Sequence, residues 1–105
     1  MASTVYSVNH ILIRLTDERW RHIVENHNDL ASHYFEVLET VAHPECVFES
    51  DAGELWAVQY ISRRKVILVI YREFALQNDG FIITAFFTSK IKKPFKRSIL
   101  WQRQP

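Results

Sequence analysis

The sequence predicts an α+β fold in which an N-terminal strand and two helices are followed by a four-stranded antiparallel β-meander. Apolar residues recur at helical spacing between residues 17 and 41, and short apolar runs separated by polar turns occupy residues 46–88. Because the connections between these later runs are short, successive strands should pair antiparallel. The 105 residues match the usual size of one domain, ~100–200 residues, so residues 1–105 are predicted to form a single domain.

The first half of the chain contains the predicted strand and both helices. Val5–Leu15 is rich in β-branched residues and partly alternating, which predicts a strand. Thr16 is a suitable N-cap for a helix that runs to about Asn28, because the acids that follow it favour the positive end of the helix dipole. Asp29 can cap a second helix, which should end at His43, since a residue before proline is biased away from helix. The apolar face of that second helix consists of Leu30, Tyr34, Val37, Leu38 and Val41.

The strands of the predicted meander follow Pro44. Lys65–Arg72 is nearly continuously apolar, which predicts a central strand that is buried on both faces. The strand before it alternates, so that Trp56, Val58 and Tyr60 share a face. The four predicted strands are Cys46–Ser50, Glu54–Ile61, Lys65–Arg72 and Phe81–Thr88.

The formal net charge of +1 conceals a division of charge along the chain, because residues 1–62 carry −7 and residues 63–105 carry +8. A basic half that contains aromatic residues is typical of a protein that binds an anion or a nucleic acid. It is equally typical of a basic tail that keeps a protein soluble. In the basic C-terminal tail, residues 91–105, Lys92 and Lys93 are candidate phosphate contacts. The alternative is that Ile99, Leu100 and Trp101 pack this tail against the core.

Cysteine content and apolar run lengths predict a cytoplasmic protein without a membrane partner. A single cysteine, Cys46, excludes an internal disulfide and fits a reducing compartment. The first residues lack the basic segment and apolar run of a secretory signal. The longest strongly apolar stretch, Val66–Tyr71, is far shorter than the ~20 residues of a membrane helix.

The predicted meander gathers cationic and hydroxyl side chains at one edge of the sheet. If the last two strands pair antiparallel, Lys65 lies close to Thr88 and Lys90, whereas Arg72 lies at the start of the last strand. Arg63 and Arg64 directly precede Lys65, and Thr84 shares a face with Thr88. This arrangement predicts an anion site that binds phosphate oxygens. The alternative is that the threonines only suit a half-exposed strand.

The histidines do not have the spacing of a metal site. His22 and His27 are five residues apart, so on a regular helix they point ~140° away from each other. A pair of metal ligands on a helix is four residues apart, and no HExxH or CxxC pattern occurs, so neither a metal nor a cofactor is expected. His27 lies in the apolar stripe, which favours a core position, and His22 lies on the opposite, solvated side. Either imidazole could transfer protons if it faced a phosphate, because histidine titrates near neutral pH.

The order of motifs resembles the phage-associated barnase–EndoU–colicin–RelE-like nucleases, and more distantly the RelE-like and BrnT-like toxins. The resemblance covers about residues 11 to 90, through the segments LTDERWRHIVENHNDL, AHPECVFE, VILVIY and GFIITAFFTSK. It implies a metal-independent endoribonuclease, in which a 2′-hydroxyl attacks its own phosphodiester and leaves a cyclic phosphate. It also implies RNA as a partner, with a cognate antitoxin or immunity protein as a further one. Carried over by motif, His22 and His27 are the acid and base, and Thr84, Thr88 and Lys90 contact the phosphate.

Two histidines on one regular helix could not converge on one phosphate. We therefore expect the first helix to end before His27, because the flanking asparagines Asn26 and Asn28 weaken helix there and let His27 turn toward the sheet edge. The alternative is that only one histidine takes part in the chemistry. Two rival functions remain open: a non-catalytic RNA- or protein-binding module on the same fold, and an inactive regulatory protein bound by an antitoxin.

Overall fold

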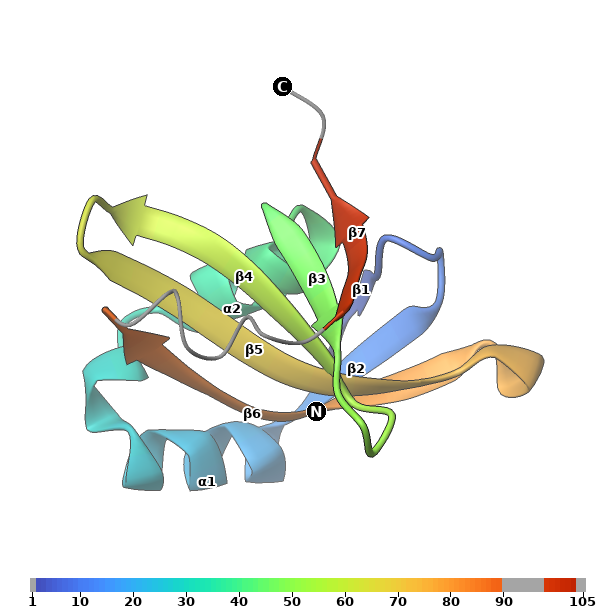
Figure 1. The fold of residues 1–105 in the computed structure, drawn as a ribbon. Coiled ribbons are helices and arrows are strands. Elements are labelled where there is room, and N and C mark those ends of the chain that lie inside the picture. The colour runs from blue at the N-terminus through green and yellow to red at the C-terminus, as the bar shows by residue number, and fades with distance from the viewer. Residues whose placement is uncertain (1, 90–97, 104–105) are drawn as a thin grey trace.

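The computed structural model describes residues 2–89 and 98–103, which form two helices and one mixed seven-stranded sheet (Figure 1). Along the sheet the strand order is β1-β2-β6-β5-β4-β3-β7. All neighbouring strands pair antiparallel except β2 and β6, which pair in parallel. The elements in chain order are β1 (Ala2–Tyr6), β2 (Leu12–Thr16), α1 (Asp17–Asn26), the 3₁₀ turn η1 (Asn28–Leu30), α2 (Tyr34–Ala42), β3 (Cys46–Glu49), β4 (Leu55–Ser62), β5 (Lys65–Phe74), the 3₁₀ turn η2 (Ala75–Gln77), β6 (Asp79–Thr88) and β7 (Ser98–Gln102).

The antiparallel meander is the best-predicted part of the fold. Strands β3, β4, β5 and β6 follow each other in the chain and pair in that order, each antiparallel to the next. β5 is a central strand, and residues 66–69 are buried although their side chains alternate between the two faces. The short polar connections predicted between the strands produce this arrangement, because antiparallel neighbours need only a tight turn.

The single N-terminal strand predicted over Val5–Leu15 is wrong. The chain turns back at residues 7–11, so that β1 and β2 form an antiparallel hairpin. The turn is closed by hydrogen bonds from Ser7 N to Ile11 O (2.9 Å) and from His10 N to Ser7 O (2.9 Å), with His10 at φ 62°. The hydroxyl of Ser7 and the amide of Asn9 both donate to Glu73 of β5. A partner far along the chain thus stabilises a turn that contains neither glycine nor proline.

The helix boundaries agree with prediction at both ends of α1 and disagree at the start of α2. Thr16 caps α1, because its Oγ1 accepts a hydrogen bond from Arg19 N at 3.1 Å. α1 ends at Asn26, before His27, as the flanking asparagines predicted. Asp29 does not cap the second helix: it lies in η1, and α2 begins only after His33. Leu30, predicted on the apolar face of the second helix, lies in η1 instead and is fully buried in the core.

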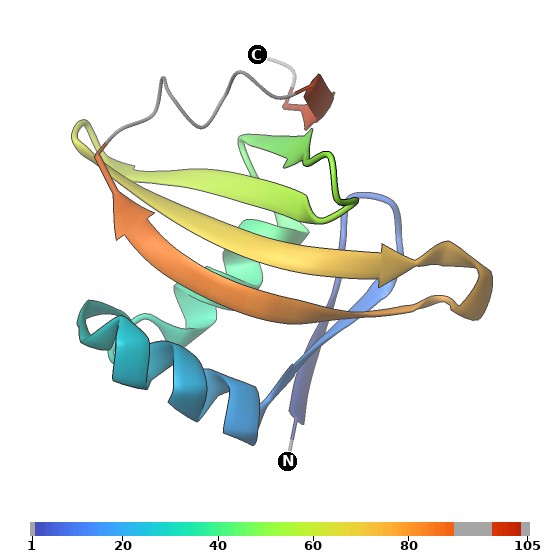
Figure 2. The ribbon, with the colours of Figure 1, turned by 60° about the horizontal axis from the view of Figure 1, so that its bottom comes forward.

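The two faces of the sheet are packed differently, with a larger apolar cluster on one face than on the other. α2 lies against one face, and α1 runs alongside β6 (Figures 1 and 2). The core on the α2 face includes Ile13, Ile23, Val37, Val41, Ile67, Val69 and Tyr71. A smaller cluster on the opposite face contains Phe48, Val58, Val66 and Leu68, with Trp56, Ile70 and Phe86 partly buried beside it. This opposite face is the one that carries Thr84 and Thr88.

The C-terminal tail contributes a strand that was not predicted. β7 pairs antiparallel with β3, and Trp101 packs against the core on the α2 face, as the packing alternative for the tail predicted. Leu100 is 46% exposed and does not share that packing. None of the helices in residues 2–89 and 98–103 is both long and apolar enough to span a membrane.

Candidate functional site

The sheet end predicted to hold phosphate contacts lies where the β4–β5 turn meets the end of β6 (Figure 1). The register pairs Tyr60 with Val66 and Val66 with Thr88, so the three residues form a row across β4, β5 and β6. Arg63 and Arg64 form the turn next to this row, and both are exposed. The predicted antiparallel register is therefore confirmed, and it brings the two arginines and Thr88 to the same end of the sheet.

The side chains at this end divide between the two faces of the sheet. Along β6, Ala85 and Phe87 pack on the α2 face, and Phe86 packs in the cluster on the opposite face. By alternation Thr84 and Thr88 lie on the same face as Phe86, as predicted. Lys65 reaches the other face, because its Nζ lies 4.2 Å from the centre of the Phe87 ring. Lys65 thus lies near Thr88 along the strands, but its charge is held on the α2 side by a cation–π contact.

His27 lies beside the threonine-bearing face. As the C-cap of α1 it has φ −138° and ψ 72°, so its side chain departs from the helical spacing. Its half-buried ring lies against Phe86, with ring centres 5.7 Å apart and an angle of 33° between the planes. Phe86 stands between Thr84 and Thr88 on their shared face, so the imidazole lies next to the strand segment that carries both hydroxyls. The prediction of a core position for His27 is confirmed only in part, because the ring packs against a sheet side chain but remains partly exposed to solvent.

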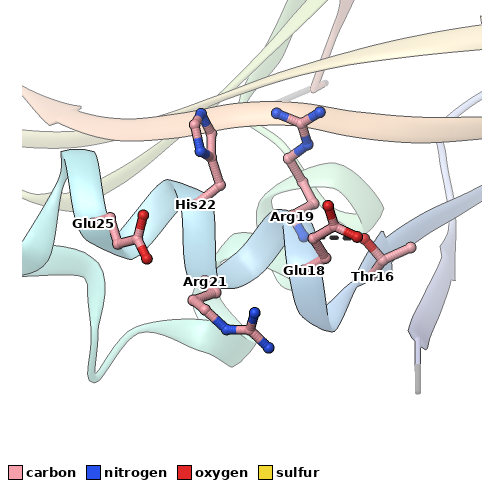
Figure 3. A pocket seen from close by; sticks show the side chains of 6 residues that line it. All are labelled: Thr16, Glu18, Arg19, Arg21, His22 and Glu25. Carbon is pink, nitrogen blue, oxygen red and sulfur yellow. Dashed lines mark hydrogen bonds between the residues drawn. The ribbon is translucent and has the colours of Figure 1, made fainter.

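His22 lies on the same side of α1 as Arg19, and both side chains point toward β6, whereas Arg21 points away (Figure 3). His22 is exposed, as predicted. The Asn26 side-chain amide donates to the His22 carbonyl at 2.9 Å and lies 3.5 Å from His22 Nε2. A surface depression of about 500 Å³ is lined by Thr16, Glu18, Arg19, Arg21, His22 and Glu25. This hollow lies along α1 and includes His22, but His27 and the two threonines are not among the residues that line it.

The other predicted site residues do not join this group in the described part of the chain. Arg72 pairs with Phe81 at the far end of β5, where its guanidinium donates to Ala52 O at 3.4 Å. Arg72 lies six residues along β5 from Val66, which corresponds to ~20 Å. The predicted separation of Arg72 from Lys65 is confirmed, so Arg72 does not belong to the group at this end of the sheet, and its role as a substrate contact stays a prediction. Lys90, Lys92 and Lys93 fall outside the described residues.

Sequence reasoning overlooked two residues at this end of the sheet. His33 lies on the α2 face, with its ring edge-on to Phe87 (centres 4.9 Å apart, 88°) and its Nδ1 3.1 Å from Glu36 Oε2. Tyr60 lies on the face of Thr88 and is 50% exposed. The alternation of β4 already placed Tyr60 with Trp56 and Val58, and only its exposure distinguishes it from those two residues.

The described residues offer neither a metal centre nor an activated thiol. Residues 2–89 and 98–103 contain no group of three or more histidine, cysteine, aspartate or glutamate side chains placed to hold a metal ion. Burial, together with the neighbouring Glu45 carboxylate, raises the pKa of the Cys46 thiol to about 11. Cys46 is therefore a protonated thiol near neutral pH, and a poor nucleophile, because the thiolate is the reactive form.

Comparisons of this chain with family models, with curated proteins and with solved structures find no match in any of the three. Function is therefore inferred from the residues of this chain and from their arrangement. Three features lie together toward one end of the molecule. They are the His27 imidazole beside the sheet, the Thr84 and Thr88 hydroxyls on β6, and the β4–β5 turn with Arg63 and Arg64.

Proposed function

We propose that the protein is a metal-independent endoribonuclease that cleaves RNA by attack of a 2′-hydroxyl on its own phosphodiester. The observation that carries this proposal is the position of His27. Because α1 ends at Asn26, the His27 ring lies against Phe86, next to the strand positions of Thr84 and Thr88. An imidazole against the strand that carries two hydroxyl groups is an arrangement suited to proton transfer at a phosphate.

The reaction requires three kinds of group. A base removes the proton from the 2′-hydroxyl, whose oxygen then forms a new bond to phosphorus. An acid protonates the 5′ oxygen as its bond to phosphorus breaks, so the products are a 2′,3′-cyclic phosphate and a free 5′-hydroxyl. Hydrogen-bond donors and cations stabilise the negative charge that develops on the phosphate oxygens.

The side chains of the candidate site supply these groups. His22 and His27 act as the acid–base pair, one in each role. Thr84 and Thr88 donate hydrogen bonds to the phosphate, and Lys90, which lies outside the described residues, adds a positive charge. Arg63 and Arg64 at the adjacent turn hold the neighbouring phosphates. The direction of the His22 side chain supports this assignment, because it points toward β6, the strand that His27 contacts (Figure 3).

The test is incubation of the purified protein with RNA in the presence of EDTA. Cleavage should persist in the chelator and leave a 2′,3′-cyclic phosphate, and it should fall at least about a hundredfold in His27→Ala, in line with the usual contribution of one acid or base. His22→Ala should lower the rate as well. His10→Ala is the matched control, because His10 is an exposed histidine on the distant β1–β2 turn and should leave cleavage unchanged. Cleavage that requires a metal ion, or that survives in both His22→Ala and His27→Ala, would overturn the proposal.

A non-catalytic RNA-binding module is the second candidate, and one observation favours it. The hollow along α1 is lined by His22 but not by His27, Thr84 or Thr88, so the groups required for chemistry do not share one depression. This alternative expects intact RNA and binding that weakens as salt rises.

A cognate antitoxin or immunity protein remains part of the first proposal, the nuclease. The nuclease proposal with a cognate antitoxin predicts that expression of the protein is toxic to the host cell and that a neighbouring gene relieves the toxicity.

A further inference from the structure

Tyr60 is an exposed aromatic side chain directly beside the basic β4–β5 turn. It is 50% exposed, although Val58, two residues earlier on the same face, is fully buried. Its backbone position is fixed by the ladder with β5, and its N–H donates to the Gln59 side chain at 3.2 Å. Tyr60 therefore presents part of an aromatic ring to solvent from a rigid strand.

The ring is close to the candidate phosphate contacts. Tyr60, Val66 and Thr88 form one row across three adjacent strands and share one face. Two strand spacings separate the backbones of Tyr60 and Thr88, a distance of ~10 Å. Arg63 and Arg64 follow Tyr60 after only two residues and are exposed. An aromatic surface, a hydroxyl and two positive charges thus lie within the span of a single nucleotide and its neighbour.

We propose that this surface binds single-stranded RNA with one nucleobase stacked on Tyr60, an inference that rests on the proposed function and specifies its substrate class. Charge complementarity identifies the occupant, because the arginines of the turn attract the phosphates on either side of the stacked base. Stacking on an aromatic side chain requires a base whose face is free, which a base within a duplex does not offer. Since every base has a π face, Tyr60 selects single strands with little preference among bases.

The experiment measures binding separately from cleavage. A fluorescently labelled single-stranded oligonucleotide with 2′-O-methyl groups lacks the attacking hydroxyl, so its affinity for the intact protein can be measured by anisotropy without turnover. Tyr60→Ala should weaken this affinity about tenfold, because stacking of one base on an aromatic residue contributes at that level. Tyr60→Phe and Tyr60→Trp should stay within about threefold of the parent protein, since both keep the ring face.

Two controls make the result specific. Tyr6 is 59% exposed on β1, an edge strand four positions from β4 in the sheet, so Tyr6→Ala should leave the affinity unchanged. Affinity for a duplex of the same sequence should be the same for Tyr60→Ala and for the parent protein. Each variant is first shown to have the parent's circular dichroism spectrum and thermal midpoint. Tyr60→Thr, which also removes the ring but suits a strand, provides the reading if Tyr60→Ala fails to fold.

The possible outcomes separate this inference from the proposed function. Single-strand binding that depends on Tyr60, without cleavage of unmodified RNA, supports the inference and overturns the nuclease. Cleavage that depends on His27, with equal single-strand affinity in Tyr60→Ala and Tyr6→Ala, overturns the inference alone. An equal loss of single-strand and duplex affinity in Tyr60→Ala also overturns it, and absence of any RNA binding overturns both.

Discussion

Removal of the two arginines of the β4–β5 turn should reduce the salt dependence of RNA binding. Arg63 and Arg64 are exposed at the end of the sheet that carries Thr88, so both guanidinium groups can reach phosphates of a bound strand. The double variant Arg63→Gln, Arg64→Gln keeps long polar side chains in the turn and removes two positive charges. Lys65 is left in place, because its ammonium group is held over the Phe87 ring on the other face.

The magnitude follows from the release of counterions. Each phosphate neutralised on a single strand contributes about 0.7 to the slope of log K against log salt concentration. Loss of two contacts should therefore make the slope less negative by about 1.4. Between about 50 and 200 mM salt, the parent protein should lose about sevenfold more affinity than the double variant loses.

The assay is a series of anisotropy titrations of a 2′-O-methyl single-stranded oligonucleotide at increasing potassium chloride concentrations. Arg72→Gln is the matched control, because Arg72 lies on the same strand as Lys65 but at its far end, beside Phe81. Its slope should equal that of the parent protein. A double variant with an unchanged slope, or an Arg72→Gln variant with the same change as the double variant, would refute the assignment of phosphate contacts to the turn.

Two further predictions concern the stability of the fold. A Cβ at Gly80 would lie 2.2 Å from the Arg72 carbonyl oxygen and 2.6 Å from Ile13 Cδ1, so Gly80→Ala should lower the free energy of unfolding in urea by about 3 kcal/mol. A loss below about 1 kcal/mol would show that the β5–β6 ladder yields easily at this point. The second prediction concerns Cys46, whose thiol pKa is raised by burial from 9.0 to about 11, so the fold favours the protonated thiol. This contribution to the free energy of unfolding is fully present below pH 9 and is lost as the pH rises through 11. Between pH 9 and 11, the free energy of unfolding should therefore decline less in Cys46→Val than in the parent protein. Some decline should remain in the variant, because burial also raises the pKa of Tyr71. Equal declines in both proteins would contradict the reasoning.

The end of α1 shows how far local sequence can predict a candidate site residue. The asparagines on both sides of His27 compete for backbone hydrogen bonds, which is a property of those residues themselves. Helix termination before His27 was therefore predictable, and α1 ends at Asn26. The contact of the His27 ring with Phe86 was not, because it joins residues that are far apart in the chain.

The N-terminal hairpin shows the opposite case. The pattern of Val5–Leu15 alternates as one strand would, and its turn lacks the glycine or proline that usually marks a reversal. The reversal is stabilised by hydrogen bonds from Ser7 and Asn9 to Glu73, a residue of β5. The turn itself contains only Ser7 and Asn9 as turn-forming residues, and the partner that stabilises it lies more than sixty residues away.

For this protein, the sequence by itself determined the α+β class, the antiparallel meander, the N-cap at Thr16 and the gathering of Arg63, Arg64 and Thr88 at one end of the sheet. Each of these depends on local properties, namely periodicity, capping and connection length, which a chain carries in consecutive residues. Only the tertiary structure decided which face each side chain takes and how far it is exposed. It turned Lys65 to the α2 face, set the His27 ring against Phe86 and left Tyr60 half exposed beside the basic turn. These outcomes depend on packing between distant segments, because a side chain's neighbours on a sheet come from other strands.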